Sequence, residues 1–286
     1  MEENSLYYSL LIYSITNGTA NYAIIKKEQK QILDNFNNYY LPKTNKPFKK
    51  NDIPDEIKKD IALIKEKVNN ENLYNLYNNL TNIKIKNDLS LLLKLIKGKY
   101  NSKTNTITYT TINSRFHELM HLASSCYDEK NNIWLSGFIN YNNKPIYGKA
   151  LNEGYTELIT RRIFNKRTTF YNEEVKIVSF FELLFDKKAL ESYYFNNDIY
   201  SFINHIGSYI GKENAIKLLL QFDYGFNLKM QGNPLYKLVY TNLELKLCEI
   251  FKLYNKSLLK QVDYLKLLDK TLITKNYQKT KQFIAS

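Results

Sequence analysis

Apolar residues recur at helical spacing through most of the first ninety residues of the chain. Three or four positions separate successive apolar side chains, as at Ile57, Ile61 and Ile64, and this period indicates a single buried helix face. Helices are predicted at 22–40, 55–68, 72–80 and 89–96. Residues 41–54 contain three of the five prolines and predict a loop. Gly98 is expected to end the last of these helices.

The pattern changes after Gly98, where β-branched residues become frequent. Over residues 106–110 Thr alternates with Ile and Tyr, after turn signals at Asn101-Ser102 and Thr104-Asn105, and this predicts a strand. Three further elements are predicted in order: a helix at 113–125, a β-like segment from Ile133 to Tyr147, and a helix from Ala150 to Phe164. Within the β-like segment, Asn142-Asn143 is a candidate hairpin turn.

From Glu173 onward nearly all of the chain is periodic in the helical sense. Breaks are predicted near Asn196-Asn197, Gly211 and 225–234. The sequence therefore predicts an α+β protein that is predominantly α-helical, with a small β-sheet beside the helix at 113–125. Three regions are expected to form one compact unit: an N-terminal helical region at 1–95, a central core at 96–168 and a C-terminal helical region at 169–286.

Composition narrows the class of protein without revealing its chemistry. Hydrophobic residues make up 44% of the chain, which is enough apolar surface to exclude disorder over most of it. Cys126 and Cys248 are too few for a disulfide-stapled scaffold or a Cys-rich zinc module. The net charge is +13, but only four of the 41 cationic residues are Arg, the residue best suited to base edges and phosphates. We therefore expect a solvated Lys/Asn-rich surface and no nucleic-acid partner.

No targeting segment and no membrane span are expected. The apolar run 6–15 follows two glutamates rather than Lys or Arg, and Ser and Tyr interrupt it. Nowhere do 18 consecutive apolar residues occur, which excludes a transmembrane helix. The expected location is cytoplasmic.

Two of the three histidines stand four residues apart, in His117-Glu118-Leu119-Met120-His121. On a helix these two positions project from one face, one turn apart, so both imidazoles can bind one Zn²⁺. Glu118 lies beside them and can take a proton from a metal-bound water. A chain of this composition would contain the HExxH pattern by chance about 0.002 times. The alternative is a pair of solvated or core-edge histidines on an ordinary helix.

A carboxylate on the following helix offers the third ligand that catalytic zinc requires. No third histidine lies close downstream, because His205 is far along the chain. Glu153 and Glu157 stand four residues apart in the segment NEGYTE, on one face of the predicted helix. If Glu153 binds the metal, Glu157 lies one turn away and can accept the N–H of a ligand histidine, which fixes the tautomer of that ring. The alternative is an exposed helix with two solvated glutamates.

HELMH followed by NEGYTE resembles the gluzincins, zinc metallopeptidases of the HExxH type, and their compact minigluzincin core. The resemblance covers about residues 98–164, where GKYNSKTNTITY is similar to the strand-turn-strand that precedes their active-site helix and pairs with substrate. It implies a zincin-like core flanked by helical regions. It also implies these roles: zinc ligands His117, His121 and Glu153, general base Glu118, and Glu157 as the partner of a ligand histidine.

The motifs leave open which group stabilises the oxyanion of the peptidase transition state. Tyr147, just ahead of the second helix, is the first candidate for this catalytic role, because it resembles the tyrosine that precedes the glutamate ligand in lethal-factor-like gluzincins, with a spacing that differs by about a residue. His205 is of the type used by thermolysin-like enzymes, and a structural role is its alternative. Another tyrosine, or none, is the further possibility. Tyr155 is expected to point away from the zinc face into the core.

The sequence therefore predicts a zinc-dependent metallopeptidase that hydrolyses a peptide or protein, with Zn²⁺ as its cofactor and its oligomeric state left open. One alternative is a regulatory or binding protein that retains the zincin scaffold and senses or cleaves one specific partner. Another is a nucleic-acid binder that uses the +13 charge and would show salt-dependent affinity for any duplex.

Overall fold

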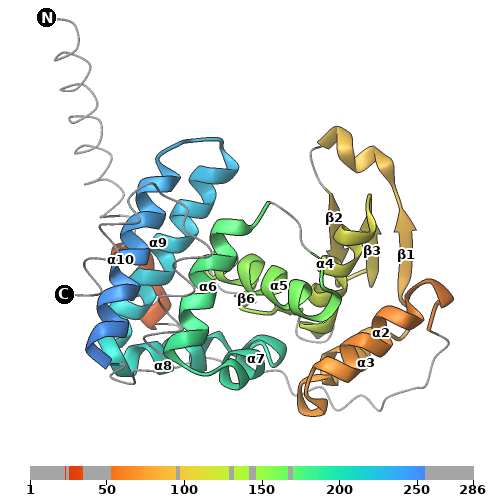
Figure 1. The fold of residues 1–286 in the computed structure, drawn as a ribbon, viewed down its shortest axis with the longest axis horizontal. Coiled ribbons are helices and arrows are strands. Elements are labelled where there is room, and N and C mark those ends of the chain that lie inside the picture. The colour runs from red at the N-terminus through yellow and green to blue at the C-terminus, as the bar shows by residue number, and fades with distance from the viewer. Residues whose placement is uncertain are drawn as a thin grey trace, which may run out of the picture.

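Helices account for most of the described chain, and two small sheets accompany them (Figure 1). The structure, a computed structural model, describes residues 23, 26–34, 53–94, 97–128, 132–141, 146–166 and 170–254. Each sheet has three strands, so the predicted α+β class with predominant helices is confirmed. Within the described ranges, no helix combines the length and the apolar character that crossing a membrane requires.

The N-terminal helices form where the apolar period predicts them. Residues 26–34 are helical, and three helices follow: α2 (Asp55–Lys67), the 3₁₀ helix η1 (Asn70–Asn72) and α3 (Tyr74–Asn79). Acidic residues lie in the first turn of α2 and lysines in its last turn, so its charges complement the helix dipole. Of the helix predicted at 22–40, only residues 23 and 26–34 are described. Of the loop predicted at 41–54, only residues 53 and 54 are described.

A strand and a 3₁₀ helix occupy a stretch that the pattern assigned to α-helix and its connections. β1 (Lys84–Asn87) exposes most of its side chains and so lacks the alternation that marks a half-buried strand. The helix predicted at 89–96 is present as the 3₁₀ helix η2 (Leu89–Lys94) and not as an α-helix. Gly98 begins the strand β2 (Gly98–Asn101) instead of ending a helix. β1 forms through parallel pairing with β3 (Thr106–Tyr109), and no local pattern reports such distant hydrogen bonds.

The first sheet has the strand order β1-β3-β2, which places β2 at one edge. β2 and β3 form an antiparallel hairpin, and the strand predicted at 106–110 is confirmed as β3. Asn105, in the turn, has a φ of 46°. Its side-chain amide donates hydrogen bonds to the carbonyl groups of Asn79 and Thr81, each at 2.7 Å. These bonds attach the hairpin to the end of α3.

The second sheet is antiparallel, with the order β4-β5-β6. Its strands are β4 (Ser125–Asp128), β5 (Ile133–Ser136) and β6 (Ile139–Asn140). The β-like segment is thus confirmed at β5 and β6, whereas β4 lies directly after a helix and escapes the pattern. The turn between β5 and β6 contains Gly137, which has a φ of 52°. The candidate turn at Asn142-Asn143 lies outside the described residues.

The motif helices and the helical C-terminal region complete the fold. Their bounds are α4 (Ile112–Ala123), α5 (Lys149–Phe164), α6 (Asn172–Leu184), α7 (Lys187–Phe195), α8 (Ile199–Ile210), α9 (Lys212–Met230) and α10 (Tyr236–Tyr254). The breaks predicted at Asn196-Asn197 and Gly211 are confirmed. The break predicted at 225–234 starts later than expected, because Gly225 lies inside α9 and this helix ends at Met230. A Cβ at Gly225 would lie 2.5 Å from a ring carbon of Tyr240, so the glycine permits close packing of α9 on α10.

Buried side chains from Ile32 to Phe251 form one hydrophobic cluster, to which the N-terminal, central and C-terminal regions all contribute. α5 is buried on most sides and packs against α4, α6 and α9 (Figure 1). Side chains on a helix inside a close-packed core have little freedom to move. The glutamates of NEGYTE are therefore carried by a rigid element.

Candidate metal centre

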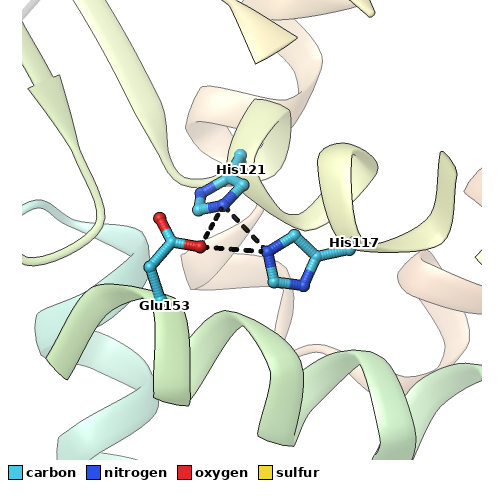
Figure 2. A group of neighbouring side chains, drawn as sticks. All are labelled: His117, His121 and Glu153. Carbon is cyan, nitrogen blue, oxygen red and sulfur yellow. Dashed lines mark hydrogen bonds and ion pairs between the residues drawn. The ribbon is translucent and has the colours of Figure 1, made fainter. Parts of the chain in front are cut away.

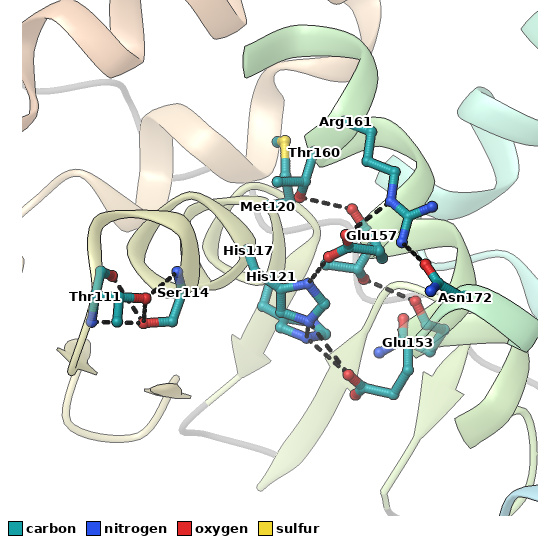
Figure 3. A network of polar contacts seen from close by, with 12 residues as sticks. Thr111, Ser114, His117, Met120, His121, Glu153, Glu157, Thr160, Arg161 and Asn172 are labelled. Atoms are coloured by element: carbon teal, nitrogen blue, oxygen red, sulfur yellow. Dashed lines mark hydrogen bonds and ion pairs between the residues drawn. The ribbon is translucent and has the colours of Figure 1, made fainter. Parts of the chain in front are cut away.

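α4 presents both motif histidines on one face and buries its apolar residues from Phe116 to Ala123. Thr111 and Ser114 exchange the two hydrogen bonds of a capping box, with N–Oγ distances of 3.1 and 3.2 Å. Leu119, on the buried side, has no exposed surface. Rotation of the helix would expose this side to water, so His117 and His121 are held toward α5, one turn apart (Figure 3).

A carboxylate from a distant helix caps the N-terminus of α5. Asp223 of α9 is buried and accepts hydrogen bonds from the backbone N–H groups of Gly148 (2.6 Å) and Ala150 (2.8 Å). Gly148 has a φ of 84°, and a Cβ there would lie 2.5 Å from the carbonyl oxygen of Phe138, so glycine is required. Burial raises the pKa of Asp223 to about 7, although the amide donors act to lower it. Asp223 thus fixes the start of the helix that carries Glu153.

Three side chains from α4 and α5 meet at one point (Figure 2). The Nε2 atoms of His117 and His121 lie 3.1 Å apart. Oε2 of Glu153 lies 3.3 Å from Nε2 of His117 and 3.5 Å from Nε2 of His121. These three atoms form a nearly equilateral triangle, here named the ligand triangle. The structure brings together the three residues that the sequence predicts to be metal ligands.

The dimensions and the chemistry of the ligand triangle fit Zn²⁺. In a tetrahedral site with ligands about 2.0–2.1 Å from the metal, two ligand atoms lie about 3.3 Å apart. The measured separations are 3.1, 3.3 and 3.5 Å. Two imidazole nitrogens and one carboxylate oxygen are typical donors of a catalytic zinc site, which keeps a fourth position open. Mg²⁺ and Ca²⁺ prefer oxygen ligands alone, so the donor set favours zinc.

Glu157 contacts His117 at the ring nitrogen that lies outside the ligand triangle. Its Oε2 lies 3.2 Å from Nδ1 of His117, and its Oε1 accepts a hydrogen bond from Nε of Arg161 at 2.8 Å. Arg161 also donates to the side-chain oxygen of Asn172, at the start of α6, at 2.7 Å (Figure 3). Because Glu157 contacts Nδ1 of His117, the other ring nitrogen, Nε2, is left to form a corner of the ligand triangle. The structure places Glu157 where the i,i+4 spacing predicts.

His117 and Glu153, at two corners of the ligand triangle, shift each other's pKa values in opposite directions. Burial acts to lower the pKa of His117, but hydrogen bonds to Glu153 and Glu157 outweigh it and raise that pKa to about 10. Burial also acts to raise the pKa of Glu153, yet the charge of His121 and the hydrogen bonds from both histidines hold it well below its usual range. A bound metal replaces the protons that otherwise compensate the carboxylates.

Glu118 lies beside the ligand triangle and is not part of it. Its side chain is buried and accepts a hydrogen bond from the backbone N–H of Tyr100 in β2. A Cβ at Gly98 would lie 2.8 Å from Oε1 of Glu118, so strand and carboxylate pack closely because position 98 is glycine. Burial raises the pKa of Glu118, against the opposing charges of His121 and His117. A raised pKa makes a carboxylate a stronger proton acceptor.

A cavity of about 270 Å³ gives access to these groups. Glu118, His121 and Glu153 line one part of it, and residues 98–100 of the edge strand β2 border it. Tyr171, the residue before α6, also lines it. The general-base candidate, two residues of the ligand triangle and a strand edge therefore share one space.

Tyr171 is a site residue that the sequence pattern does not reveal. Its ring stacks on His117, with centroids 5.2 Å apart and planes at 14°, and it lines the same cavity as Glu153. Burial, and then the charge of Glu153, raise its pKa well above the usual value, so the phenol stays protonated and can donate. A Cβ at Gly154 would lie 2.8 Å from the backbone carbonyl group of Glu174. The glycine of NEGYTE, which lets α6 approach α5, is the one hint of this neighbour in the sequence.

Tyr147 and His205, the oxyanion donors considered from the sequence, do not line the cavity. Tyr147 is buried in the core and is not among the described residues that line the cavity. His205 lies in α8, where its ring stacks on Phe185 at 4.3 Å and its Nδ1 lies 3.2 Å from the hydroxyl of Tyr193. These contacts agree with the structural alternative for His205. Tyr155 is fully buried in the core, as expected.

Comparisons with known proteins add no family to this description. No protein-family model, no curated protein and no solved structure matches the chain. The chemistry of the site has to be inferred from its own geometry.

Proposed function

We propose that the chain is a zinc-dependent metallopeptidase of the gluzincin type. His117, His121 and Glu153 bind Zn²⁺, Glu118 is the general base, and Glu157 holds His117 in the ligand tautomer. The observation that carries this proposal is the ligand triangle, whose sides of 3.1, 3.3 and 3.5 Å match the spacing of ligands around tetrahedral zinc. A buried glutamate beside the triangle and a cavity in front of it provide for a proton acceptor and a substrate.

The zinc ion supplies, when bound, a Lewis acid that polarises a peptide carbonyl and lowers the pKa of water in the site. Glu118 accepts the proton of the attacking water while the oxygen of that water forms a bond to the carbonyl carbon. When the C–N bond breaks, Glu118 delivers the same proton to the leaving nitrogen. The products are a new carboxyl terminus and a new amine, and Glu118 returns to its starting state.

The edge strand β2 supports a peptide as the substrate. It ends the first sheet, and residues 98–100 border the cavity that holds Glu118. An extended peptide can add to such an edge through main-chain hydrogen bonds, which suit any sequence. The backbone N–H of Tyr100 already holds Glu118, so a peptide on β2 lies close to its proton acceptor.

Tyr171 is proposed, in place of Tyr147, as the donor that stabilises the oxyanion. Replacing Tyr171 by Phe keeps the ring that stacks on His117 and removes only the hydroxyl. We expect kcat to fall by about 10²–10³-fold, the usual effect of losing one oxyanion donor, while the zinc content stays the same. Steady-state kinetics and metal analysis of the same preparation measure both. A loss of kcat in Tyr147→Phe but not in Tyr171→Phe would reverse this assignment.

The proposed function is tested with a peptide library. Protein loaded with one equivalent of Zn²⁺ is expected to generate new peptide ends, detected by mass spectrometry, and a chelator is expected to abolish them until zinc is restored. The chelator removes the group that polarises the carbonyl, whereas the protein residues remain. A zinc-loaded, folded protein that leaves the library intact would contradict the proposal.

A further inference from the structure

We propose that the cavity selects an aromatic side chain next to the peptide bond that is cleaved. This inference rests on the proposed function, because it names the substrate class of the same site. The selecting surface is the wall formed by Trp134 and Tyr141 together with the floor formed by Ser125 and Ser136, all of which line the cavity.

The wall is a preformed aromatic pair. The rings of Trp134 and Tyr141 stack with centroids 4.2 Å apart and planes at 23°. The backbone N–H of Tyr141 donates to the carbonyl of Trp134 at 3.0 Å, which fixes the two residues relative to each other. A further ring that enters the cavity can extend this stack or meet its edge, geometries that aromatic pairs prefer. Because the pair is already ordered, binding costs it little conformational entropy.

The floor is small and its polar groups are paired. Ser125 and Ser136 are direct partners in the register of β4 and β5. The hydroxyl of Ser125 donates to that of Ser136 at 2.9 Å, and both residues are buried. An apolar ring above them therefore leaves the hydrogen bond between the two hydroxyls in place. Larger residues at either position would fill the space above the floor.

The wall stands next to the ligand triangle. His121 and Glu153 line the same cavity as Trp134 and Tyr141. Burial and then the charge of Glu153 raise the pKa of Tyr141, so its hydroxyl stays protonated beside the ring stack. A cavity of about 270 Å³ is smaller than pockets for drug-sized ligands. It therefore suits one substrate side chain beside the reacting bond.

Charges of both signs surround the cavity and do not by themselves select an acidic side chain. Lys99 lines the cavity, and Nζ of Lys103 lies 6.0 Å from the centroid of the Trp134 ring. Glu118 and Glu153 line the cavity as well, so carboxylates and Lys99 border the same space. An acidic substrate would be drawn to the lysines and repelled by the glutamates. A preference for Asp or Glu is thus a clear alternative outcome.

The test uses zinc-loaded full-length protein and peptides that differ only beside the cleaved bond, with Phe, Tyr, Leu, Ala or Glu on either side. The Phe peptide is expected to exceed the Ala peptide by about tenfold or more in kcat/KM, the upper end of what an aromatic contact contributes. Trp134→Ala is expected to bring this ratio toward one, whereas Trp134→Phe retains it. Ser136→Leu is expected to lower the ratio as well, by filling the space above the floor.

The outcomes separate this inference from the proposed function. If no peptide is cut although zinc is bound, the proposed function fails. If peptides are cut with equal kcat/KM, or with a preference for Glu, the peptidase stands and the aromatic specificity is overturned. The wild-type ratio decides the matter even if a variant does not fold, because it needs no substitution.

Discussion

Replacement of Glu118 by Gln is expected to lower kcat/KM by about 10²–10⁴-fold, the usual contribution of a positioned general base. The amide of Gln cannot accept the proton of the attacking water. It retains the size of Glu, so the packing against Gly98 persists, and its oxygen can accept the N–H of Tyr100. The zinc content is expected to be unchanged, because Glu118 does not belong to the ligand triangle. Single-turnover cleavage and metal analysis measure the two effects.

The control for Glu118→Gln is Glu71→Gln, which removes an exposed carboxylate in η1 far along the chain from both motifs. It is expected to cleave at the wild-type rate. The Glu118→Gln protein also tests the regulatory alternative. If the protein cleaves one specific partner, the inactive variant is expected to hold this partner in a stable complex, whereas the wild type cuts and releases it. Undiminished turnover in Glu118→Gln would remove this residue from the mechanism.

Replacement of His117 by Ala is expected to abolish stoichiometric zinc binding. The wild-type protein should retain about one Zn²⁺ per chain after dialysis, and the variant close to none, because three protein ligands are the usual number of a catalytic zinc site. The variant loses one vertex of the ligand triangle, and Glu157 loses the contact between its Oε2 and Nδ1 of the missing ring, 3.2 Å long in the wild type. Activity should vanish with the metal. Inductively coupled plasma mass spectrometry measures the zinc content.

Two further variants calibrate this measurement. Glu157→Gln is expected to weaken zinc affinity by about 10–100-fold, because it supports the ligand His117 without touching the metal. His205→Ala is expected to bind zinc like the wild type, because His205 packs against Phe185 and Tyr193 in the C-terminal region. Sub-stoichiometric zinc in the wild type, with no difference in His117→Ala, would refute the metal site.

The helices of the site follow from local pattern, whereas parts of the sheets do not. α4 and α5 lie within two residues of their predicted bounds, because an apolar face repeating every three to four residues is a property of the segment itself. β1 escapes prediction because it exposes most of its side chains and owes its form to pairing with β3. Gly98 was misassigned for a related reason: its role is to let Glu118 approach β2, a contact between segments.

Tyr171 and Asp223 are two residues of the site that the local sequence pattern could not predict. Tyr171 reaches His117 because Gly154 allows α6 to approach α5, and Asp223 caps α5 from α9. Tyr147, chosen for its place in the sequence, is buried in the core. Neighbours along the chain need not be neighbours across a packed interface.

The sequence by itself determined which side chains can act together on one helix. The i,i+4 spacing of His117 and His121, and of Glu153 and Glu157, sets each pair on one face because a helix turns every 3.6 residues. Only the tertiary structure decided that the two faces meet at ligand distance, that Tyr171 joins them, and that Trp134 and Tyr141 wall the cavity. Those contacts depend on close packing between distant segments, which no local period encodes.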